Sequence, residues 1–201
     1  MTDKLNDKSG VVVKGHIKIH DPNTGEVYVD KRNAIHYENM SIALAESLAN
    51  QGQGMIYEMS FGNGGTSVDP TGIITYLTPN STGTNASLYN QTFTKVVDDR
   101  STSNTDPVRN KIETRHVSGT NYTDIVVTCL LDYGEPEGQD AFDTATDTEN
   151  LYVFDELGLK SYSPSGEGRL ITHVIFHPVQ KSLNRLVQID YTVRVQSLSG
   201  V

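Results

Sequence analysis

The sequence contains no tryptophan, a single cysteine and no long apolar run. One cysteine, Cys129, excludes an intrachain disulfide, and within "DIVVTCLLDY" it is expected to be a small buried apolar residue. No stretch approaches the roughly 20 apolar residues that a membrane-spanning helix needs. The N-terminal "MTDKLNDKSG" lacks the apolar segment of a signal peptide. We therefore expect a protein made in the cytoplasm that has no membrane partner.

Basic residues are also scarce. Lys and Arg total 16 against 25 Asp and Glu, which gives a net charge of −9. Binding to phosphate backbones needs a basic surface, so this balance argues against a nucleic-acid partner and favours a protein partner with basic patches. The 201 residues are enough for one domain with a core. We expect a single domain over 11–201, preceded by a flexible polar leader at 1–10.

Alternation of apolar and polar residues is the strongest pattern present. Val11–His20 alternates as a half-buried strand does, "DPNTG" supplies turn residues, and "EVYVD" returns as the second arm of a hairpin. "NKIETRHV", "SGTN" and "YTDIVVTCLLDY" predict a second hairpin, whose second arm is covered on both faces. Further strands are predicted in "SLYNQTFTKVV", "LYVFDELGLKSY", "GRLITHVIFHPVQK" and "RLVQIDYTVRVQ", the last with Val187, Ile189, Tyr191, Val193 and Val195 facing inward.

One short amphipathic helix is predicted at about residues 40–51, with Asn39 or Ser41 as N-cap and Gly52 as the stop. Its apolar stripe is expected to consist of Ile42, Ala45, Leu48 and Ala49. The predicted fold class is therefore mainly β: an antiparallel β-sandwich, jelly-roll-like, with this helix covering one edge or face.

The histidines include two His-x-x-x-His pairs, His16 with His20 and His173 with His177. On a helix, this spacing would present two metal ligands on one face. Both stretches, "HIKIH" and "HVIFH", alternate as strands instead. Four strand residues span roughly 13 Å, too far for both side chains to bind one ion at about 2.0–2.1 Å. Neither pair is expected to chelate a metal by itself.

A metal site that combines His20 with Asp21 or Asp30 across the first hairpin stays open as an alternative. The simpler interpretation is a polar strand face that these histidines share with Lys14 and Lys18. We therefore predict no metal site here.

An acidic loop is expected at about 134–150. Its spacing does not match the calcium-binding EF-hand loop, and the glycine that such a loop requires is missing. The simpler interpretation is a solvated loop, or a rim that contacts a basic neighbour. Its carboxylates are Glu135, Glu137, Asp140, Asp143, Asp147 and Glu149.

"FGNGGT" at Phe61–Thr66 follows a predicted strand, as phosphate-binding loops do. The third glycine of G-x-G-x-x-G is replaced by Ser67, and no Gly-Lys-Ser/Thr follows. A tight loop that uses the backbone freedom of glycine explains the motif better than a nucleotide site does.

No catalytic constellation stands out. G-x-S-x-G is absent, and no cysteine has an evident base. Asp155 and Glu156 are neighbours on a predicted strand, so they point to opposite sides and make a poor two-carboxylate catalyst. Glu156 is a candidate for a buried, hydrogen-bonded carboxylate. We predict no catalytic residue, no cofactor and no enzymatic activity.

Several segments resemble structural proteins of tailed bacteriophage particles. They are "VKGHIKIHDPNTGEVYVDKRNAIHYENMSIALAESLA", "MSFGNGGT", "FDELGLKS" and "RLITHVIFHPVQKSLNRLVQIDYTVRVQ", while residues 78–150 match no family that we can name. The resemblance implies a non-enzymatic virion component, present in several copies and contacting itself and other virion proteins. Collar or neck, baseplate, fibre attachment and capsid decoration all remain open, and the neck or tail region is preferred.

Two rival functions remain. One is a carbohydrate-binding β-sandwich for host recognition, in which Tyr152 or Tyr162 would stack on sugars, although the absence of tryptophan weighs against it. The other is a metal- or carboxylate-dependent hydrolase, for which the residues are not evident.

Overall fold

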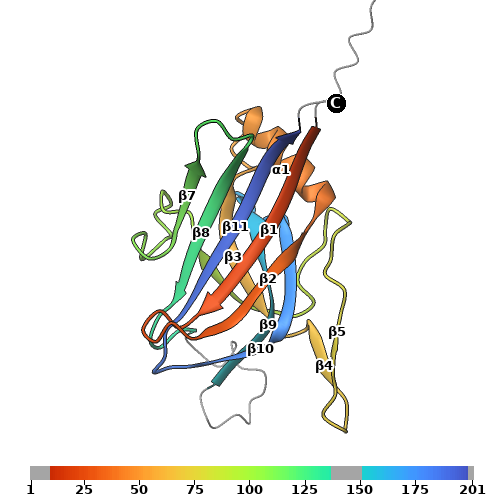
Figure 1. Cartoon of the computed structure of the whole chain (residues 1–201), viewed down its shortest axis with the longest axis vertical. Helices are drawn as coiled ribbons and strands as arrows, with labels where there is room; N and C mark the ends of the chain where they lie inside the picture. The colour runs from red at the N-terminus through yellow and green to blue at the C-terminus, as the bar shows by residue number, and fades with distance from the viewer. Residues whose placement is uncertain (1–9, 137–150, 199–201) are drawn as a thin grey trace, which may run out of the picture.

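The computed structural model describes residues 10–136 and 151–198, and its chain is almost wholly β. The strands are β1 (Gly10–His20), β2 (Val27–Ile35), β3 (Ile56–Gly62), β4 (Thr66–Val68), β5 (Ile74–Tyr76), β6 (Gln91–Val96), β7 (Lys111–His116), β8 (Tyr122–Leu131), β9 (Leu151–Ser161), β10 (Thr172–Ser182) and β11 (Val187–Leu198), and the helix is α1 (Tyr37–Leu48). The prediction of a mainly-β chain with one helix is confirmed for the described residues (Figure 1).

The large sheet is antiparallel, with the strand order β6-β3-β9-β10-β2-β1-β11-β8-β7. Both predicted hairpins are present: β1 pairs with β2 and β7 with β8, and Gly25 and Gly119 take positive φ in the turns. β8 lies between β7 and β11, so it is not an edge strand. On its second face Leu130 is buried, whereas Val126 is only half-buried.

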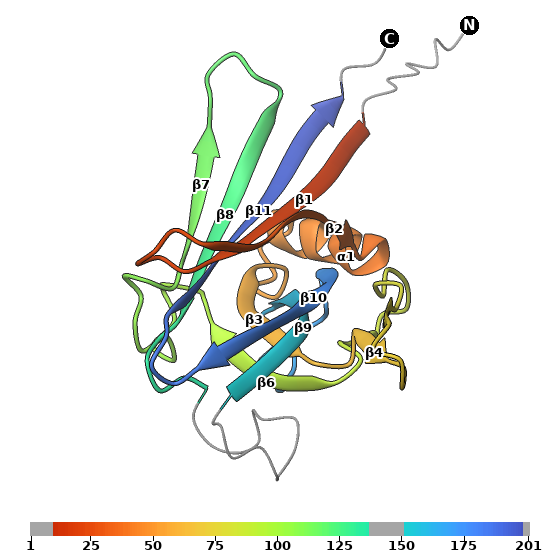
Figure 2. The same ribbon diagram turned by 60° about the horizontal axis from the view of Figure 1, so that its bottom comes forward.

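The sheet curls so that its two halves face one another, in place of two separate sheets. Figure 1 shows β2, β1, β11, β8 and β7 in front of β3, β9 and β10, and Figure 2 shows the two halves diverging toward β7. Only two residue pairs join β10 to β2, Thr172 with Ile35 and His173 with Ala34. The sheet therefore turns from one half to the other at this short junction.

The core fills the space between the two halves. The alternation predicted for β11 is confirmed for Val187, Ile189, Tyr191 and Val193, which are buried, whereas Val195 is half-buried. Ile17 and Ile19 of β1 lie on the same inner face, and Cys129 of β8 is buried with them, as predicted. The other half contributes Met59, Phe61, Phe154, Leu157, Leu159, Val174 and Phe176.

α1 begins three residues before the predicted start. Its N-cap is His36, whose Nδ1 accepts a hydrogen bond from the Asn39 backbone N–H at 3.2 Å, so neither Asn39 nor Ser41 is the cap. The helix ends at Leu48, and the chain then passes through Asn50 with a positive φ of 54°. The prediction of Gly52 as the stop was therefore wrong by several residues.

The predicted apolar stripe of α1 was also wrong. Leu48 is 89% exposed, and Ala45 and Ala49 are exposed as well, with Ile42 only half-buried. The helix instead buries Met40 and Ala43 against the core. Two stripes of similar polarity run along this helix, and the packing of the sheet halves selects the one that starts at Met40.

β4 and β5 form a separate two-stranded hairpin that projects from the body of the protein (Figure 1, lower right). Residues 66–76 are called the β4–β5 arm below. The sequence pattern did not predict this hairpin. Its strands are only three residues each, and they follow directly on the glycine-rich loop.

Two predicted segments lie largely outside the described residues, the polar leader up to residue 9 and the acidic loop at 137–150. Of the acidic residues named for that loop, Glu135 is described. Its carboxylate contacts the Lys95 ammonium and accepts the Asp132 backbone N–H at 2.8 Å.

Candidate functional site

The β4–β5 arm is amphipathic. In its ladder Thr66 faces Tyr76, Ser67 faces Thr75 and Val68 faces Ile74. Directly opposed residues of an antiparallel pair share a face, so Val68, Ile74 and Tyr76 lie on one side. The polar pair lies on the other. Val68 is 61% exposed and Tyr76 50% exposed, which leaves the apolar side of the arm in contact with solvent.

The base of the arm is tied to β9 by Asp155. One carboxylate oxygen accepts the Gly65 N–H at 2.9 Å, and the other accepts the Thr66 N–H at 2.8 Å together with the Thr66 hydroxyl. The Leu77 N–H then donates to the Gly65 carbonyl at 2.9 Å and closes the base. Asp155 therefore determines where the arm leaves the body.

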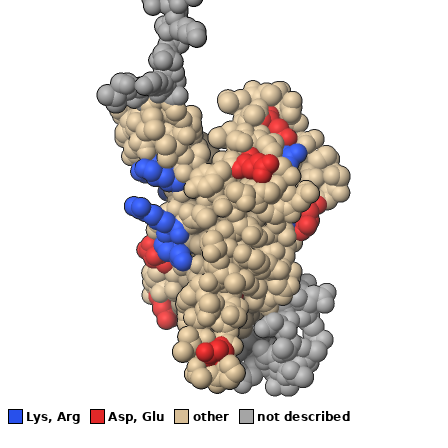
Figure 3. Space-filling view, turned by 90° about the vertical axis from the view of Figure 1, so that its right-hand side faces the viewer, with Lys and Arg blue, Asp and Glu red and all other residues tan. Residues whose placement is uncertain are grey.

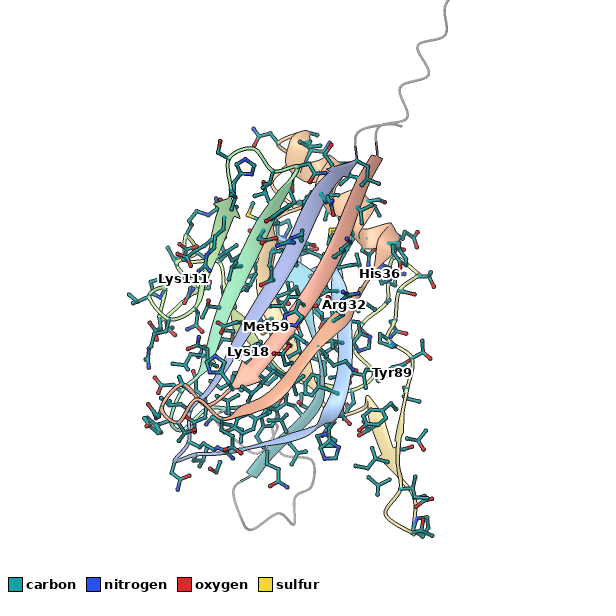
Figure 4. All side chains as sticks on the ribbon, in the orientation of Figure 1. Lys18, Arg32, His36, Met59, Tyr89 and Lys111 are labelled. Atoms are coloured by element: carbon teal, nitrogen blue, oxygen red, sulfur yellow. The ribbon has the colours of Figure 1, made fainter. Side chains whose placement is uncertain are left out.

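Glu156, the next residue of β9, binds the segments on either side of the arm. Its Oε1 accepts the N–H groups of Gly64 at 3.1 Å and Asn90 at 2.8 Å. Its Oε2 accepts the Tyr89 N–H at 2.9 Å and contacts His173 Nε2 at 2.9 Å. Figure 4 labels Tyr89 on the segment beside the arm.

His173 completes this buried cluster, which we call the anchor (Asp155, Glu156 and His173). Its Nδ1 accepts the Asn80 N–H at 2.8 Å. An Nδ1 that accepts a hydrogen bond carries no proton, so the network assigns the proton to Nε2, which donates it to Glu156. Neutral His173 thus links the segment after the arm to the same carboxylate.

Glu156 is the buried, hydrogen-bonded carboxylate that the sequence suggested. A carboxylate has about four lone-pair sites, and the four donors to Glu156 fill them. Asp155 and Glu156 are both buried. Glu156 therefore has no lone pair left for a metal ion or a substrate, and Asp155 is enclosed with three donors of its own.

The pKa values of the two acids are shifted in opposite directions. Burial raises the pKa of Asp155, and the hydrogen bonds from Thr66 and Gly65 offset this only in part. Burial also raises the pKa of Glu156, but the hydrogen bonds from His173, Asn90 and Tyr89 together outweigh it and lower the pKa overall. Neighbouring acids with divided pKa values are typical of acid–base catalysts. Here the two pKa values differ because hydrogen bonds outweigh the effect of burial at Glu156 but not at Asp155.

The glycine loop is tight for a different reason from the one predicted. Gly62, Gly64 and Gly65 are not among the glycines with positive φ, so backbone freedom does not explain them. A Cβ on Gly64 would lie 2.7 Å from the Asn90 nitrogen, and one on Gly65 would lie 3.1 Å from Asp155 Oδ1. The motif consists of glycines because the loop packs directly against the anchor and the chain at 89–90.

The other histidines are dispersed, and two of them have carboxylate partners that the sequence reading missed. His16 Nε2 lies 2.8 Å from Asp30, and His20 Nε2 lies 2.9 Å from Asp190 of β11. The histidines do lie on a polar strand face with Lys14 and Lys18, as predicted, but carboxylates of β2 and β11 lie on that face as well. The pairing of β1 with β11, which places Lys18 opposite Asp190, cannot be seen in the local sequence.

These contacts belong to an outer polar face. Figure 4 shows Lys18 on β1 next to Arg32 on β2 in the front half of the sheet. The alternative of a site made by His20 with Asp21 or Asp30 does not form, because His20 pairs with Asp190 and Asp30 with His16. Within residues 10–136 and 151–198, no group of three or more His, Cys, Asp or Glu is placed to hold a metal.

Lys181 is a further buried group that the sequence reading missed. It is fully buried, and its Nζ donates to the backbone carbonyls of Asp132 at 2.9 Å and Ser182 at 2.8 Å. Burial lowers its pKa to about 8. A lysine of reduced pKa is the chemistry of amine nucleophiles, but an enclosed Nζ that is bound to two carbonyls cannot meet a substrate.

The two tyrosines proposed for sugar stacking are not on an open surface. Tyr152 is fully buried and stacks on Phe154 with ring centroids 5.5 Å apart, and its hydroxyl lies 3.0 Å from Thr92 Oγ1. Tyr162 is half-buried and packs edge-on against Tyr57 at 5.1 Å. The stacking proposed for Tyr152 is therefore wrong, since no ligand can reach its ring.

An open apolar pocket of about 260 Å³ lies between α1 and the β7–β8–β11 part of the sheet. We call it the α1 pocket. Its one charged lining residue is Arg100, whose side chain is 75% exposed. The apolar lining comprises Met40, Ala43, Leu44, Met55, Ile56, Ile112, Ile125, Ile171, Val193 and Val195.

No family model matches this chain, and no curated protein or solved structure is significantly similar to it. Among the described residues no helix is long and apolar enough to cross a membrane. The resemblance of the terminal segments to tailed-phage structural proteins therefore stays a prediction, and the arm, the anchor and the α1 pocket carry the functional argument.

Proposed function

We propose that this chain is a structural component of a tailed-bacteriophage particle, in the neck, collar or tail region. It assembles by contacts with copies of itself and with other virion proteins, and it performs no catalysis. The resemblance of its first hairpin, its glycine loop and its closing strands to such proteins supports this proposal, as does the acidic net charge of −9.

The observation that carries the proposal is the β4–β5 arm. A two-stranded hairpin is marginally stable in water unless it packs on another surface. This arm presents Val68 and Tyr76 to solvent, yet two buried carboxylates and a buried histidine hold its base in place. A rigidly mounted hairpin with an exposed apolar side is suited to packing on another protein chain.

Mass spectrometry of purified phage particles whose genome encodes the chain tests the proposal. We expect its peptides at a constant, multiple copy number per particle, and a matching density in electron micrographs of the neck or tail. Expression during infection without incorporation into purified particles would contradict the proposal.

A further inference from the structure

The β4–β5 arm and the α1 pocket lie at opposite ends of the molecule. Figure 1 shows the arm at the lower right, whereas α1 and the end of β11 lie at the top. The arm of one copy therefore cannot fill the pocket of the same copy. Two complementary features at opposite ends of one chain are the elements of a head-to-tail contact between copies.

The arm offers apolar groups of the right kind for the pocket. Ile73, beside its turn, is 63% exposed, and Val68, on the adjoining strand, is 61% exposed. The pocket of about 260 Å³ is lined mainly by aliphatic side chains and is open to solvent. Exposed apolar surface on both partners is removed from water when the two meet, and this is the main driving force of association.

Charge also matches between the two surfaces. From residue 59 to residue 94 the only charged side chain is Asp69, at the turn of the arm. Its carboxylate accepts the Thr71 hydroxyl at 2.7 Å and the Ile73 N–H at 3.0 Å. These hydrogen bonds lower the pKa of Asp69, so it is ionised at neutral pH. The one charged side chain that lines the α1 pocket is the cation Arg100, whose Nε lies 3.2 Å from Asp98 of the same chain. Because the side chain is 75% exposed, its terminal nitrogens remain open to a second carboxylate.

The side of the molecule that carries the arm is otherwise poor in charge. Figure 3 shows this side as mostly uncharged atoms, with a few separated acidic groups and basic groups gathered at one edge. A net charge of −9 makes copies repel one another overall, and a surface with few charges contributes little to that repulsion.

We propose that the β4–β5 arm of one copy docks in the α1 pocket of a second copy, with Asp69 next to Arg100, in a head-to-tail contact. Repetition of this contact closes a ring when its rotation allows and otherwise extends as a filament. The proposal rests on the proposed function for its biological setting alone, since the contact itself is a property of the purified chain.

Two variants test the arm and the α1 pocket separately, and neither substitutes a core residue. Val68→Ser combined with Ile73→Ser alters the arm, and Thr114→Glu places a negative charge at the exposed rim of the α1 pocket. Val108→Ser is the matched control, because Val108 is 79% exposed and belongs to neither surface. All four substituted positions are exposed. The thermal unfolding of each variant is therefore expected to match wild type, and this measurement establishes that each variant folds.

Sedimentation equilibrium measures the result. Wild type and Val108→Ser are expected to associate with concentration, whereas the arm and pocket variants each weaken association at least about tenfold. The decisive sample mixes the two defective variants. Each retains the surface that the other lacks, so a head-to-tail contact predicts a complex of twice the 22.1 kDa chain mass and nothing larger.

Several outcomes overturn the docking. The first is a wild-type chain that stays at 22.1 kDa at concentrations on the order of 1 mM. The second is an arm variant or a pocket variant that associates as strongly as wild type. The third is a mixture of the two variants that forms no complex. A chain that stays monomeric yet occurs in purified particles would refute this contact and leave the proposed function standing.

Discussion

At the scale of single residues, Glu156 holds together the segments that lie before and after the β4–β5 arm. Its carboxylate accepts backbone N–H groups from the glycine loop and from Tyr89 and Asn90, and a further hydrogen bond from His173. Segments distant in sequence are therefore positioned by one charged group. Buried networks of this kind are costly when one member is lost, because its partners remain unpaired in a dry environment.

Glu156→Gln is expected to destabilise the protein by about 2–4 kcal/mol at neutral pH, because an amide nitrogen would face backbone N–H donors. Since the folded protein lowers the pKa of Glu156, its stabilising contribution is complete above the ordinary value of 4.5 and is lost as pH falls below it. The gap between wild type and variant should therefore shrink in acid. Chemical denaturation at several pH values measures this gap.

The control for that substitution is Glu26→Gln, which alters an exposed carboxylate and should change stability by less than about 0.5 kcal/mol. Equal effects of the two variants would contradict the role assigned to Glu156.

Lys181 gives a pH dependence of the same sign as Glu156, but in an alkaline window. Its pKa falls from 10.5 to about 8 on folding, so the unfolded chain binds more protons between these values and stability rises with pH across the interval. Lys181→Met is expected to remove this rise, which amounts to a difference on the order of 2–3 kcal/mol between its ends. Denaturation of both proteins at pH 8 and pH 10.5 measures it. An identical rise in the variant would show that other groups cause it.

At the scale of elements, α1 shows how packing overrides pattern. Its sequence offers one stripe through Ile42 and Leu48 and another through Met40, Ala43 and Leu44. Both have helical spacing, and neither is clearly the more apolar. The helix starts at Tyr37 because His36 caps it and donates its own backbone N–H to the Ile171 carbonyl at 2.9 Å. This attachment to the end of the sheet turns the Met40 side inward.

Alanine substitutions on the two sides of α1 should separate these stripes. Met40→Ala removes a buried side chain and is expected to cost about 2–4 kcal/mol. Leu48→Ala alters a side chain that is 89% exposed and should cost less than about 0.5 kcal/mol. Urea denaturation compares the two directly, and a larger loss for Leu48→Ala would restore the stripe predicted from the sequence.

The sequence predicts that the glycine loop is a tight connection, but it does not predict that the loop holds the base of the β4–β5 arm. "FGNGGT" marks a loop wherever it occurs. Its function as a mount depends on Asp155 and Glu156, which lie about 90 residues further along the chain. No local pattern links the two segments, and only the pairing of β3 with β9 brings them together.

At the scale of the whole molecule, charge and shape act together. The net charge of −9 repels copies of the chain, and this repulsion is screened by salt over a Debye length of about 8 Å at physiological ionic strength. A single exposed ion pair such as Asp69 with Arg100 contributes at most about 1 kcal/mol. Overall repulsion and apolar burial, rather than that pair, should therefore control how association depends on salt.

Raising sodium chloride from about 20 mM to about 300 mM is expected to strengthen self-association of the wild-type chain, since screening reduces the repulsion while apolar contacts persist. Sedimentation equilibrium at the two salt concentrations measures the change. Weaker association in high salt would mean that ion pairs dominate the contact, which contradicts an arm that docks through Val68 and Ile73.

The sequence by itself determined the elements that depend on neighbouring residues. These include the alternating strands, the two hairpins with their turn segments, the burial of Cys129, and the mainly-β class with one helix. The tertiary structure decided the strand order, the buried side of α1, the His20–Asp190 pair and the anchor that holds the arm. The physical reason is distance along the chain. The hydrophobic period of a strand or a helix, two or 3.6 residues, can be recognised within a short segment of the sequence. Strand pairing, in contrast, joins residues more than a hundred positions apart.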